Sequence, residues 1–265
     1  MSAGCEPISG RFSADLLSRV EDAGLNASAP REQRWVDGWL VRFSPAKAKR
    51  ARCIQPVAAG RLTVAEKLAL CLPIYETAGL RPYVRITPFS QPGDLDARLA
   101  AAGMVSIDET RVMVLASIAS LAAAPSTGPS LRVAAVGPAD FADWAGKERG
   151  SSAEERRAHA DRIAYSPVPH RSVLAFAEDG STVGAGQVVV EGDLAGLYGV
   201  LTAEGHRRQG VAEAVCRHLL DLATIAGARI AYLQVEASNE PARRIYRRLG
   251  FVDGYAYHYR TPPQP

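Results

Sequence analysis

The stretch HRRQGVAEAV, residues 206–215, joins a predicted strand to a predicted helix. Before it, AGLYGVLT (195–202) has the apolar character of a strand, and after it apolar residues recur at helical spacing. A helix start carries unpaired backbone N–H groups and the positive end of the helix dipole, so it binds anions, most often phosphate. Gly210 lets the backbone approach such a ligand without a Cβ, and Arg207 and Arg208 add positive charge. The stretch therefore predicts a cradle for a diphosphate.

The same stretch has a plainer interpretation, in which the glycine only relieves a tight turn and the arginines are solvated. It matches neither GxxxxGK[ST] nor GxGxxG, so both interpretations stay open until the surrounding elements are considered. Apolar runs predict strands at 131–136, 171–179, 182–193, 195–202, 229–237 and 255–260, the second and third forming an antiparallel pair. Helical patterns run over 138–149, 152–164, from 211 up to Gly227, and 240–250.

Two motifs in this half resemble the signatures of the GNAT acetyltransferase superfamily. The pattern Arg207-x-x-Gly210-x-Ala212 resembles the acetyl-CoA signature [R/Q]-x-x-G-x-[G/A]. Further along, SNEPARRIYRRLGF (238–251) resembles the second signature through Asn239, Ala242, Tyr246, Leu249, Gly250 and Phe251. The order of predicted elements also matches over 131–260. The resemblance implies an α/β fold with a GNAT-type mixed, mostly antiparallel sheet flanked by helices.

The resemblance also implies where acetyl-CoA, the cosubstrate, would lie. The CoA pyrophosphate would be bound by the backbone N–H groups of Arg208, Gln209, Gly210, Val211 and Ala212. The side chain of Arg207 would lie beside it. The strand at Val200 and Leu201 would pair its backbone with the pantetheine amides. Asn239 would help to hold the CoA arm, with Ala242 on the helix face that carries Tyr246.

Acyl transfer to an amine needs a neutral amine, a polarised thioester carbonyl and a proton for the departing thiolate. The resemblance places Tyr246 near the sulfur as the acid, while the alternative is a core aromatic residue. Many members carry a glutamate on the strand before the phosphate loop, but LAGLYGVLT contains no acidic residue. We expect Glu236 to act as the base through water, or else to be a solvated carboxylate at a strand end. His258 is a weaker candidate.

The first half of the chain resembles the second. YVRITPFSQPGDLDARLAAAGM (83–104) aligns with YLQVEASNEPARRIYRRLGF (232–251), and each is preceded by a similar helix. Thr63 stands where the second half has Gly210, and Leu99 stands where it has Tyr246. We therefore expect a degenerate GNAT-like half that does not bind CoA, as in tandem GNAT proteins. The alternative is that two alanine-rich units look alike by composition.

Composition sets the domain organisation. A chain of 265 residues with 47% hydrophobic residues is long enough for one large domain or two modest ones. SLAAAPSTGPS (120–130) has the composition of a linker. We expect a degenerate domain over 1–119, this linker, and a catalytic domain over 131–265. The basic turn SPAKAKR (44–50) is either solvated or borders the acceptor cleft and favours an anionic acceptor.

Charge and cysteine content exclude several functions. The net charge of +3 is too balanced to predict nucleic-acid binding. The four cysteines form no CxxC pair, so neither a zinc site nor a disulfide framework is expected, and no metal is needed. The first residues lack the pattern of a signal peptide, and no apolar run approaches a membrane span. We expect a cytoplasmic protein without membrane partners; its oligomeric state stays open.

The sequence thus predicts an N-acetyltransferase that transfers the acetyl group of acetyl-CoA to a primary amine by direct attack in a ternary complex. The acceptor is a small-molecule amine or a protein amine. The alternatives are a non-catalytic acyl-CoA-binding or regulatory module and a protein-lysine acetyltransferase.

Overall fold

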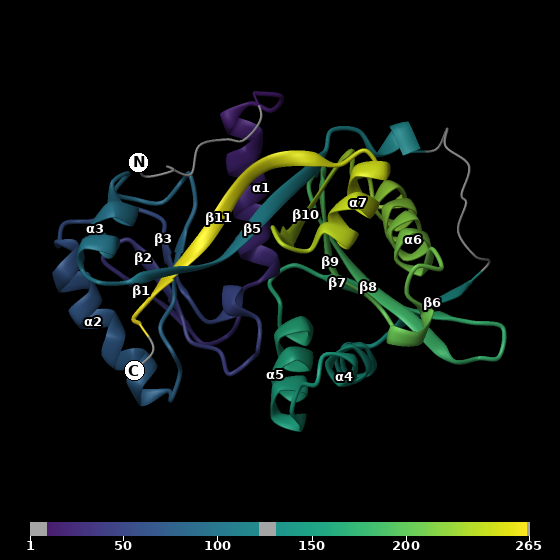
Figure 1. Ribbon diagram of the computed structural model, residues 1–265, viewed down its shortest axis with the longest axis horizontal. Helices are drawn as coiled ribbons and strands as arrows, with labels where there is room; N and C mark the ends of the chain where they lie inside the picture. The colour runs from purple at the N-terminus through teal and green to yellow at the C-terminus, as the bar shows by residue number, and fades with distance from the viewer. Residues whose placement is uncertain (1–9, 122–130, 264–265) are drawn as a thin grey trace.

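A computed structural model describes residues 10–121 and 131–263 of the chain (Figure 1). The first half contains α1 (Ala14–Ala27), β1 (Gln33–Val36), β2 (Trp39–Arg42), the 3-10 helix η1 (Lys49–Ala51), β3 (Ile54–Pro56), α2 (Val64–Thr77), β4 (Val84–Ile86), α3 (Leu95–Ala101), β5 (Val105–Leu115) and η2 (Ile118–Leu121). The second half contains β6 (Arg132–Val136), α4 (Pro138–Glu148), α5 (Ala153–Ala164), β7 (His170–Phe176), β8 (Thr182–Glu191), β9 (Leu194–Thr202), η3 (Glu204–His206), α6 (Val211–Ile225), β10 (Ile230–Glu236), α7 (Glu240–Arg248) and β11 (Val252–Thr261).

One eleven-stranded sheet runs through both halves in the order β1-β2-β3-β4-β11-β5-β10-β9-β8-β7-β6. The pairs β3–β4 and β9–β10 are parallel, and the other pairs are antiparallel, including the predicted pair β7–β8. The mixed, mostly antiparallel sheet flanked by helices confirms the predicted fold class.

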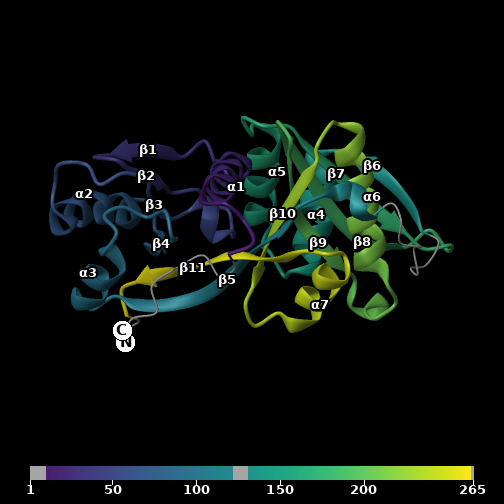
Figure 2. The ribbon, with the colours of Figure 1, turned by 90° about the horizontal axis from the view of Figure 1, so that it is seen from above.

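Each half ends in the same series of elements, as the internal resemblance predicted. The first half gives β3-α2-β4-α3-β5 and the second gives β9-α6-β10-α7-β11. The final strand of each series pairs with the penultimate strand of the other, since β5 lies beside β10 and β11 lies beside β4. β5 and β11 also pair with each other. The two halves therefore exchange their last strands at the centre of the sheet (Figure 2).

The predicted division of the chain falls close to this exchange. Ser120 and Leu121 belong to η2, and residues 122–130 of the predicted linker lie outside the described residues. The division into domains 1–119 and 131–265 stays a prediction.

Alternate residues of the central strands face opposite helices. Val112 and Val114 of β5 pack in the cluster that contains α1, whereas Met113 and Leu115 pack in the cluster that contains α6 and α7. Such alternation follows from the two-residue period of a strand. Helix α1 lies at the junction of the two halves, so it covers strands from both (Figures 1 and 2).

Two glycines of β8 set the position of α6. A Cβ on Gly184 would lie 2.7 Å from Val211, and a Cβ on Gly186 would lie 2.7 Å from Leu219. The absence of these side chains lets α6 pack closely on the sheet, with Val211 and Leu219 buried. This packing fixes the start of α6 beside the end of β9.

Candidate active site

Strands β9 and β10 separate along their length. They pair from Leu194 and Ile230 up to Leu197 and Leu233, after which β9 keeps only β8 as a neighbour and β10 keeps β5. At the point of separation two residues of β9, Gly199 and Val200, bulge, and Gly199 has a positive φ of 60°. The edge of β9 that carries Val200 and Leu201 is therefore turned away from β10, leaving a slot between the strands.

The predicted phosphate loop ends in a glycine that no side chain caps. Gly210 is the N-cap of α6, has a φ of 84°, and makes no side-chain capping hydrogen bond. The side chains of Arg207, Arg208 and Gln209 are exposed, and Arg208 also has a positive φ of 64°. The first turn of α6 thus presents backbone N–H groups that its own N-cap residue does not satisfy. This is the geometry that an anion needs.

The corresponding loop of the first half is filled by the chain itself. Thr63, the N-cap of α2, forms a capping box with Glu66. The Asp37 carboxylate accepts hydrogen bonds from the N–H groups of Arg61 and Leu62, at 2.8–3.0 Å. It also pairs with the buried Lys67 at 3.3 Å. An internal anion and a capping side chain occupy the place where the second half leaves its N–H groups open.

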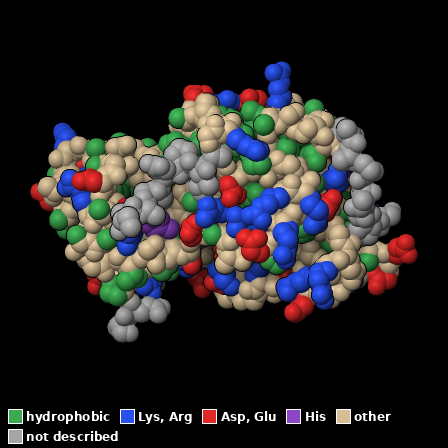
Figure 3. All heavy atoms as spheres, turned by 45° about the horizontal axis from the view of Figure 1, so that its top comes forward, with side chains coloured by type: hydrophobic (Ala, Val, Ile, Leu, Met, Phe, Trp, Pro, Cys, Tyr) green, Lys and Arg blue, Asp and Glu red, His purple; other side chains and the backbone are tan. Residues whose placement is uncertain are grey.

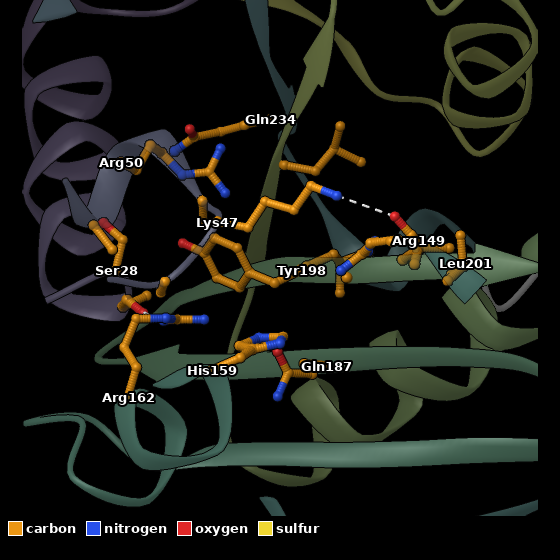
Figure 4. A pocket seen from close by; sticks show the side chains of 18 of the residues that line it. Ser28, Lys47, Arg50, Arg149, His159, Arg162, Gln187, Tyr198, Leu201 and Gln234 are labelled. Atoms are coloured by element: carbon orange, nitrogen blue, oxygen red, sulfur yellow. Dashed lines mark hydrogen bonds between the residues drawn. The ribbon is translucent and has the colours of Figure 1, made fainter. Parts of the chain in front are cut away.

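A cavity of about 540 Å³ opens where β9 and β10 separate (Figure 4). The structure brings together along it six of the predicted site residues, which are Val200, Leu201, Glu236, Asn239, Ala242 and Tyr246. Residues 207–212 do not line this cavity. The first half supplies one wall, through the end of α1 and residues 46–48, 50 and 51 around η1, so the basic turn does border the cavity.

Tyr246 belongs both to the core and to the cavity wall. Its ring lies edge-on to Phe251, with 6.2 Å between centroids, and only 9% of the residue is exposed. Burial raises the pKa of its hydroxyl above the usual value, with a further contribution from Cys216. The hydroxyl therefore stays protonated at neutral pH, as a proton donor must be.

The predicted site residues Glu236, Asn239 and Ala242 lie around the end of β10. Glu236 is exposed as the last residue of the strand, and its backbone carbonyl accepts a hydrogen bond from the Asn239 N–H at 3.0 Å. The Asn239 side chain caps α7 by accepting from the Ala242 N–H at 3.2 Å. His258 lies elsewhere, 2.8 Å from Asp96, and does not line the cavity.

The opposite side of the cavity contains residues that sequence reasoning missed. Arg149, which follows α4, and His159 and Arg162 of α5 line it together with His170, Gln187, Tyr198 and Gln234. Helices α4 and α5 read from sequence only as polar helices, so nothing in their pattern marked these side chains. Tyr198 donates or accepts a hydrogen bond with Tyr232 at 2.8 Å, and burial raises its pKa to about 12.

Both histidines of the cavity are neutral at physiological pH. Burial, together with the charges of Arg162 and Arg149, lowers the pKa of His159 to about 3. Burial and Arg162 lower the pKa of His170 to about 4. The cavity therefore draws its positive charge from arginine and lysine alone.

Two surveys of the described residues bear on other functions. No helix among them is long and apolar enough to cross a membrane. No cluster of three or more histidine, cysteine or acidic side chains suited to a metal ion occurs within residues 10–121 and 131–263.

Comparison with known proteins bears on the family of the chain. Residues 16–260 match the family described as "Probable histone acetyltransferase Rv0428c C-terminal". Streptothricin acetyltransferase of Streptomyces lavendulae is 38% identical over 79 residues, which cover 24% of this chain and 42% of that protein. The chain thus spans less than half the length of this curated relative.

Two solved structures share the fold. A GCN5-related N-acetyltransferase from Kribbella flavida superposes with a TM-score of 0.68 at 20% identity, covering 94% of this chain and 96% of that one. A tandem GNAT protein from the clavulanic acid biosynthesis pathway gives a TM-score of 0.54 at 17% identity, covering 80% and 76%. The family match extends over almost the whole described chain. The chain belongs to the family described as "Probable histone acetyltransferase Rv0428c C-terminal" and shares its fold with GCN5-related N-acetyltransferases.

Proposed function

We propose that the enzyme transfers the acetyl group of acetyl-CoA to the primary amine of a small molecule by direct attack in a ternary complex. One observation carries the proposal: a single cavity joins the slot between β9 and β10 to a polar chamber walled by both halves. A donor in the slot and an acceptor in the chamber would meet without either leaving the protein. Such joint binding favours direct transfer, because it holds the reacting atoms in contact.

The donor fits the cradle and the slot. The open N–H groups of Arg208, Gln209, Gly210, Val211 and Ala212, with the charge of Arg207, suit the diphosphate. The turned-out edge of β9 at Val200 and Leu201 offers backbone groups to the pantetheine amides. Asn239 and Ala242 border the cavity where the arm would lie.

In the reaction, the amine nitrogen of the acceptor attacks the thioester carbonyl carbon and forms a tetrahedral intermediate. The C–S bond then breaks, the thiolate takes a proton from the Tyr246 hydroxyl, and the amine proton goes to a base. We assign the base role to Glu236 acting through water, since it is the carboxylate at the end of β10 on the cavity wall. The products are the acetamide and free CoA.

The state of the cysteines supports direct attack over a covalent enzyme intermediate. Cys53, Cys71 and Cys216 are buried. Burial raises the pKa of Cys216, the cysteine beside Tyr246, to about 12, so its thiol is not a nucleophile at neutral pH.

A second candidate acceptor is a protein lysine, because the matching family is described as a histone acetyltransferase. The cationic cavity wall disfavours a basic histone tail by like-charge repulsion, whereas the name of the streptothricin relative points to a small molecule. We therefore place the small-molecule acceptor first.

The test is a steady-state assay of the full chain with acetyl-CoA, a panel of small amines and a histone-tail peptide. The release of CoA thiol and the mass of the acetylated product are measured together. Direct transfer predicts one acetamide per CoA released and intersecting double-reciprocal plots. Parallel plots would indicate an acetyl-enzyme instead, and acetylation of the peptide alone would replace the small-molecule acceptor with a protein.

A further inference from the structure

Three arginines from three separate elements meet in the cavity. Arg50 comes from η1, Arg149 follows α4, and Arg162 lies on α5. They surround Tyr198, as Figure 4 shows, and the Arg50 guanidinium lies 5.9 Å from the centre of the Tyr198 ring. Arg50 and Arg162 are half-buried, and Arg149 is exposed at the rim. The basic side of the cavity is thus assembled from both halves of the chain.

These arginines have no carboxylate partner. Within the part of the chain that the structure describes, no acidic oxygen lies within 4.0 Å of the side-chain nitrogens of Arg50, Arg149 or Arg162. Other arginines of the chain do have carboxylate partners. On the surface in Figure 3, basic side chains lie among acidic ones, and Arg243 of α7 pairs with both Glu240 and Asp253.

The hydrogen bonds of the cavity arginines are also few. Arg50 donates to the Tyr257 hydroxyl at 3.2 Å, Arg162 donates to the Ala27 carbonyl at 3.1 Å, and the Nε atom of each is buried without a partner. Arg42, another buried arginine without a carboxylate, donates instead to three oxygens. Each of these two half-buried guanidinium groups donates to one acceptor among the described residues, so most of its donors are available to a ligand.

Repulsion from Arg50 adds to the cost of burying Arg162. Burial, and then the charge of Arg50, lower the pKa of Arg162 to about 10. An anion placed among the three guanidinium groups would relieve both effects.

The two carboxylates of the cavity do not supply that anion. Glu155 accepts a hydrogen bond from the Ser152 N–H at 2.9 Å in the capping box of α5. Glu236 lies at the exposed end of β10. The other basic groups that line the cavity are Lys47, which donates to the Arg149 carbonyl at 3.1 Å, and Arg156, which pairs with Asp143 at 3.1 Å.

We propose that the acceptor is a small primary amine that also carries a carboxylate or phosphate group, and that Arg50, Arg149 and Arg162 bind this group. The inference rests on the proposed function and specifies its substrate class. Guanidinium groups match the paired oxygens of both anions, which explains why arginines from separate elements converge here. The same charges disfavour a polycationic acceptor.

The arginines have a second effect on the bound acceptor. Positive charge near its ammonium group lowers the pKa of that group and so favours the neutral amine that attacks the thioester. His159 and His170 are neutral and add no opposing charge, and Tyr198 and Tyr246 stay protonated. The two carboxylates of the cavity, Glu155 in the capping box of α5 and Glu236 at the exposed end of β10, oppose the effect.

The first test uses inorganic phosphate as a probe of the arginines. The full chain is saturated with CoA, which fills the diphosphate cradle, and is titrated with phosphate in a calorimeter. Arg162→Gln is compared with Arg157→Gln, which removes the same charge from an exposed position of the same helix that does not line this cavity. We expect saturable binding by the wild type and Arg157→Gln, weakened about 10-fold or more in Arg162→Gln. Equal binding by the two variants, or none by the wild type, would overturn the inference.

The second test uses pairs of amines that differ only in the anion. β-Alanine is compared with its amide, and O-phosphoethanolamine with ethanolamine. The pair in which the anionic member reacts faster shows whether the arginines bind a carboxylate or a phosphate. We expect kcat/KM to be at least about 10-fold higher for the anionic member, and Arg162→Gln but not Arg157→Gln to abolish that preference. In Arg162→Gln the acidic limb of kcat should also move to higher pH, by about one unit, because the pKa of the bound ammonium group rises.

The two proposals fail differently. If the uncharged amine reacts as well as its anionic partner, acetyl transfer stands and the anionic acceptor is wrong. If acetyl-CoA does not bind, or is hydrolysed without any amine product, the proposed function itself is wrong.

Discussion

The two halves differ in the residue at the N-cap of the corresponding helix, which is Thr63 in α2 and Gly210 in α6. Thr63 closes the start of α2 with its own side chain, and Asp37 takes the N–H groups of the preceding loop. Gly210 leaves the start of α6 open, in a left-handed conformation that other residues rarely adopt. The same helix and strand order therefore gives one half that satisfies its own loop and one half that offers the loop to a ligand.

We predict that Gly210→Val weakens CoA binding by at least about 10-fold. A β-branched residue is strained at this positive φ, and its Cβ would meet the diphosphate. The matched control is Gly205→Ala, because a Cβ at Gly205 meets nothing within 4 Å. Calorimetry should give one CoA per wild-type chain; two per chain, or an unchanged affinity in Gly210→Val, would contradict the prediction.

We predict that Tyr246→Phe lowers kcat by roughly 10²–10⁴-fold, the usual contribution of a general acid, and leaves the affinity for acetyl-CoA nearly unchanged. The ring keeps its packing against Phe251, so the melting temperature should change little. Because burial raises the pKa of the hydroxyl, Tyr246 should not produce a basic limb in the wild-type rate profile below about pH 10.

The control for this variant is Tyr165→Phe, which removes a hydroxyl from an exposed tyrosine outside the cavity. Near-normal turnover by Tyr246→Phe would show that the ring belongs only to the core. Water would then be the proton donor.

At the scale of elements, helix α1 is tied to strands of both halves by a buried ion pair. The Glu21 carboxylate accepts two hydrogen bonds from the Arg85 guanidinium of β4, one of them at 3.0 Å. It also accepts a hydrogen bond from the Tyr255 hydroxyl of β11 at 2.5 Å. Burial alone would raise the pKa of Glu21, but the adjacent Arg85 guanidinium holds it below the usual value of 4.5. The charged pair is therefore part of the folded state.

We predict that Glu21→Gln destabilises the protein by about 3–5 kcal/mol at neutral pH, because it leaves Arg85 buried without its partner. A carboxylate whose folded pKa is lowered stabilises the fold above its unfolded pKa, and this stabilisation is lost as the pH falls through the folded pKa. The difference between wild type and Glu21→Gln should thus be full above about pH 5 and shrink below about pH 4.

Urea unfolding measured from pH 3 to pH 7 checks this dependence. Glu76→Gln, an exposed substitution in α2, serves as the control and should run parallel to the wild type. A Glu21→Gln deficit that stays constant over the whole range would mean that the pair does not act through the Glu21 charge.

At the scale of the whole molecule, the exchange of β5 and β11 makes each half depend on the other. β5 lies between β10 and β11, so the second half alone would lose the strand that joins them. It would also lose α1 from the tyrosine-rich face and the wall that Arg50 provides. Exposed strand edges and apolar faces promote aggregation.

We predict that a fragment of residues 131–265 is aggregated or inactive, whereas its co-expression with residues 1–130 restores acetyl transfer. Size-exclusion chromatography and the amine assay measure the two outcomes. A monomeric, fully active 131–265 fragment would show that the first half is dispensable, and failure of co-expression alone would point to a need for the covalent connection.

The sequence by itself determined the elements of the second half and their order, the open helix start at Gly210 and its absence at Thr63. These features depend on neighbours within a few residues, since periodicity, capping and a positive φ are local properties. The roles of Tyr246 and Glu236 stay predictions.

Only the tertiary structure decided the exchange of β5 and β11, the filling of the first loop by Asp37, and the meeting of Arg50, Arg149 and Arg162. Arg149 and Arg162 belong to segments whose sequence predicts only polar helices, and the turn that carries Arg50 left both a solvated and a cleft position open. Their convergence depends on how distant strands pair and how α4 and α5 pack on the sheet. Strand pairing and helix packing are determined by burial over the whole fold and not by local sequence.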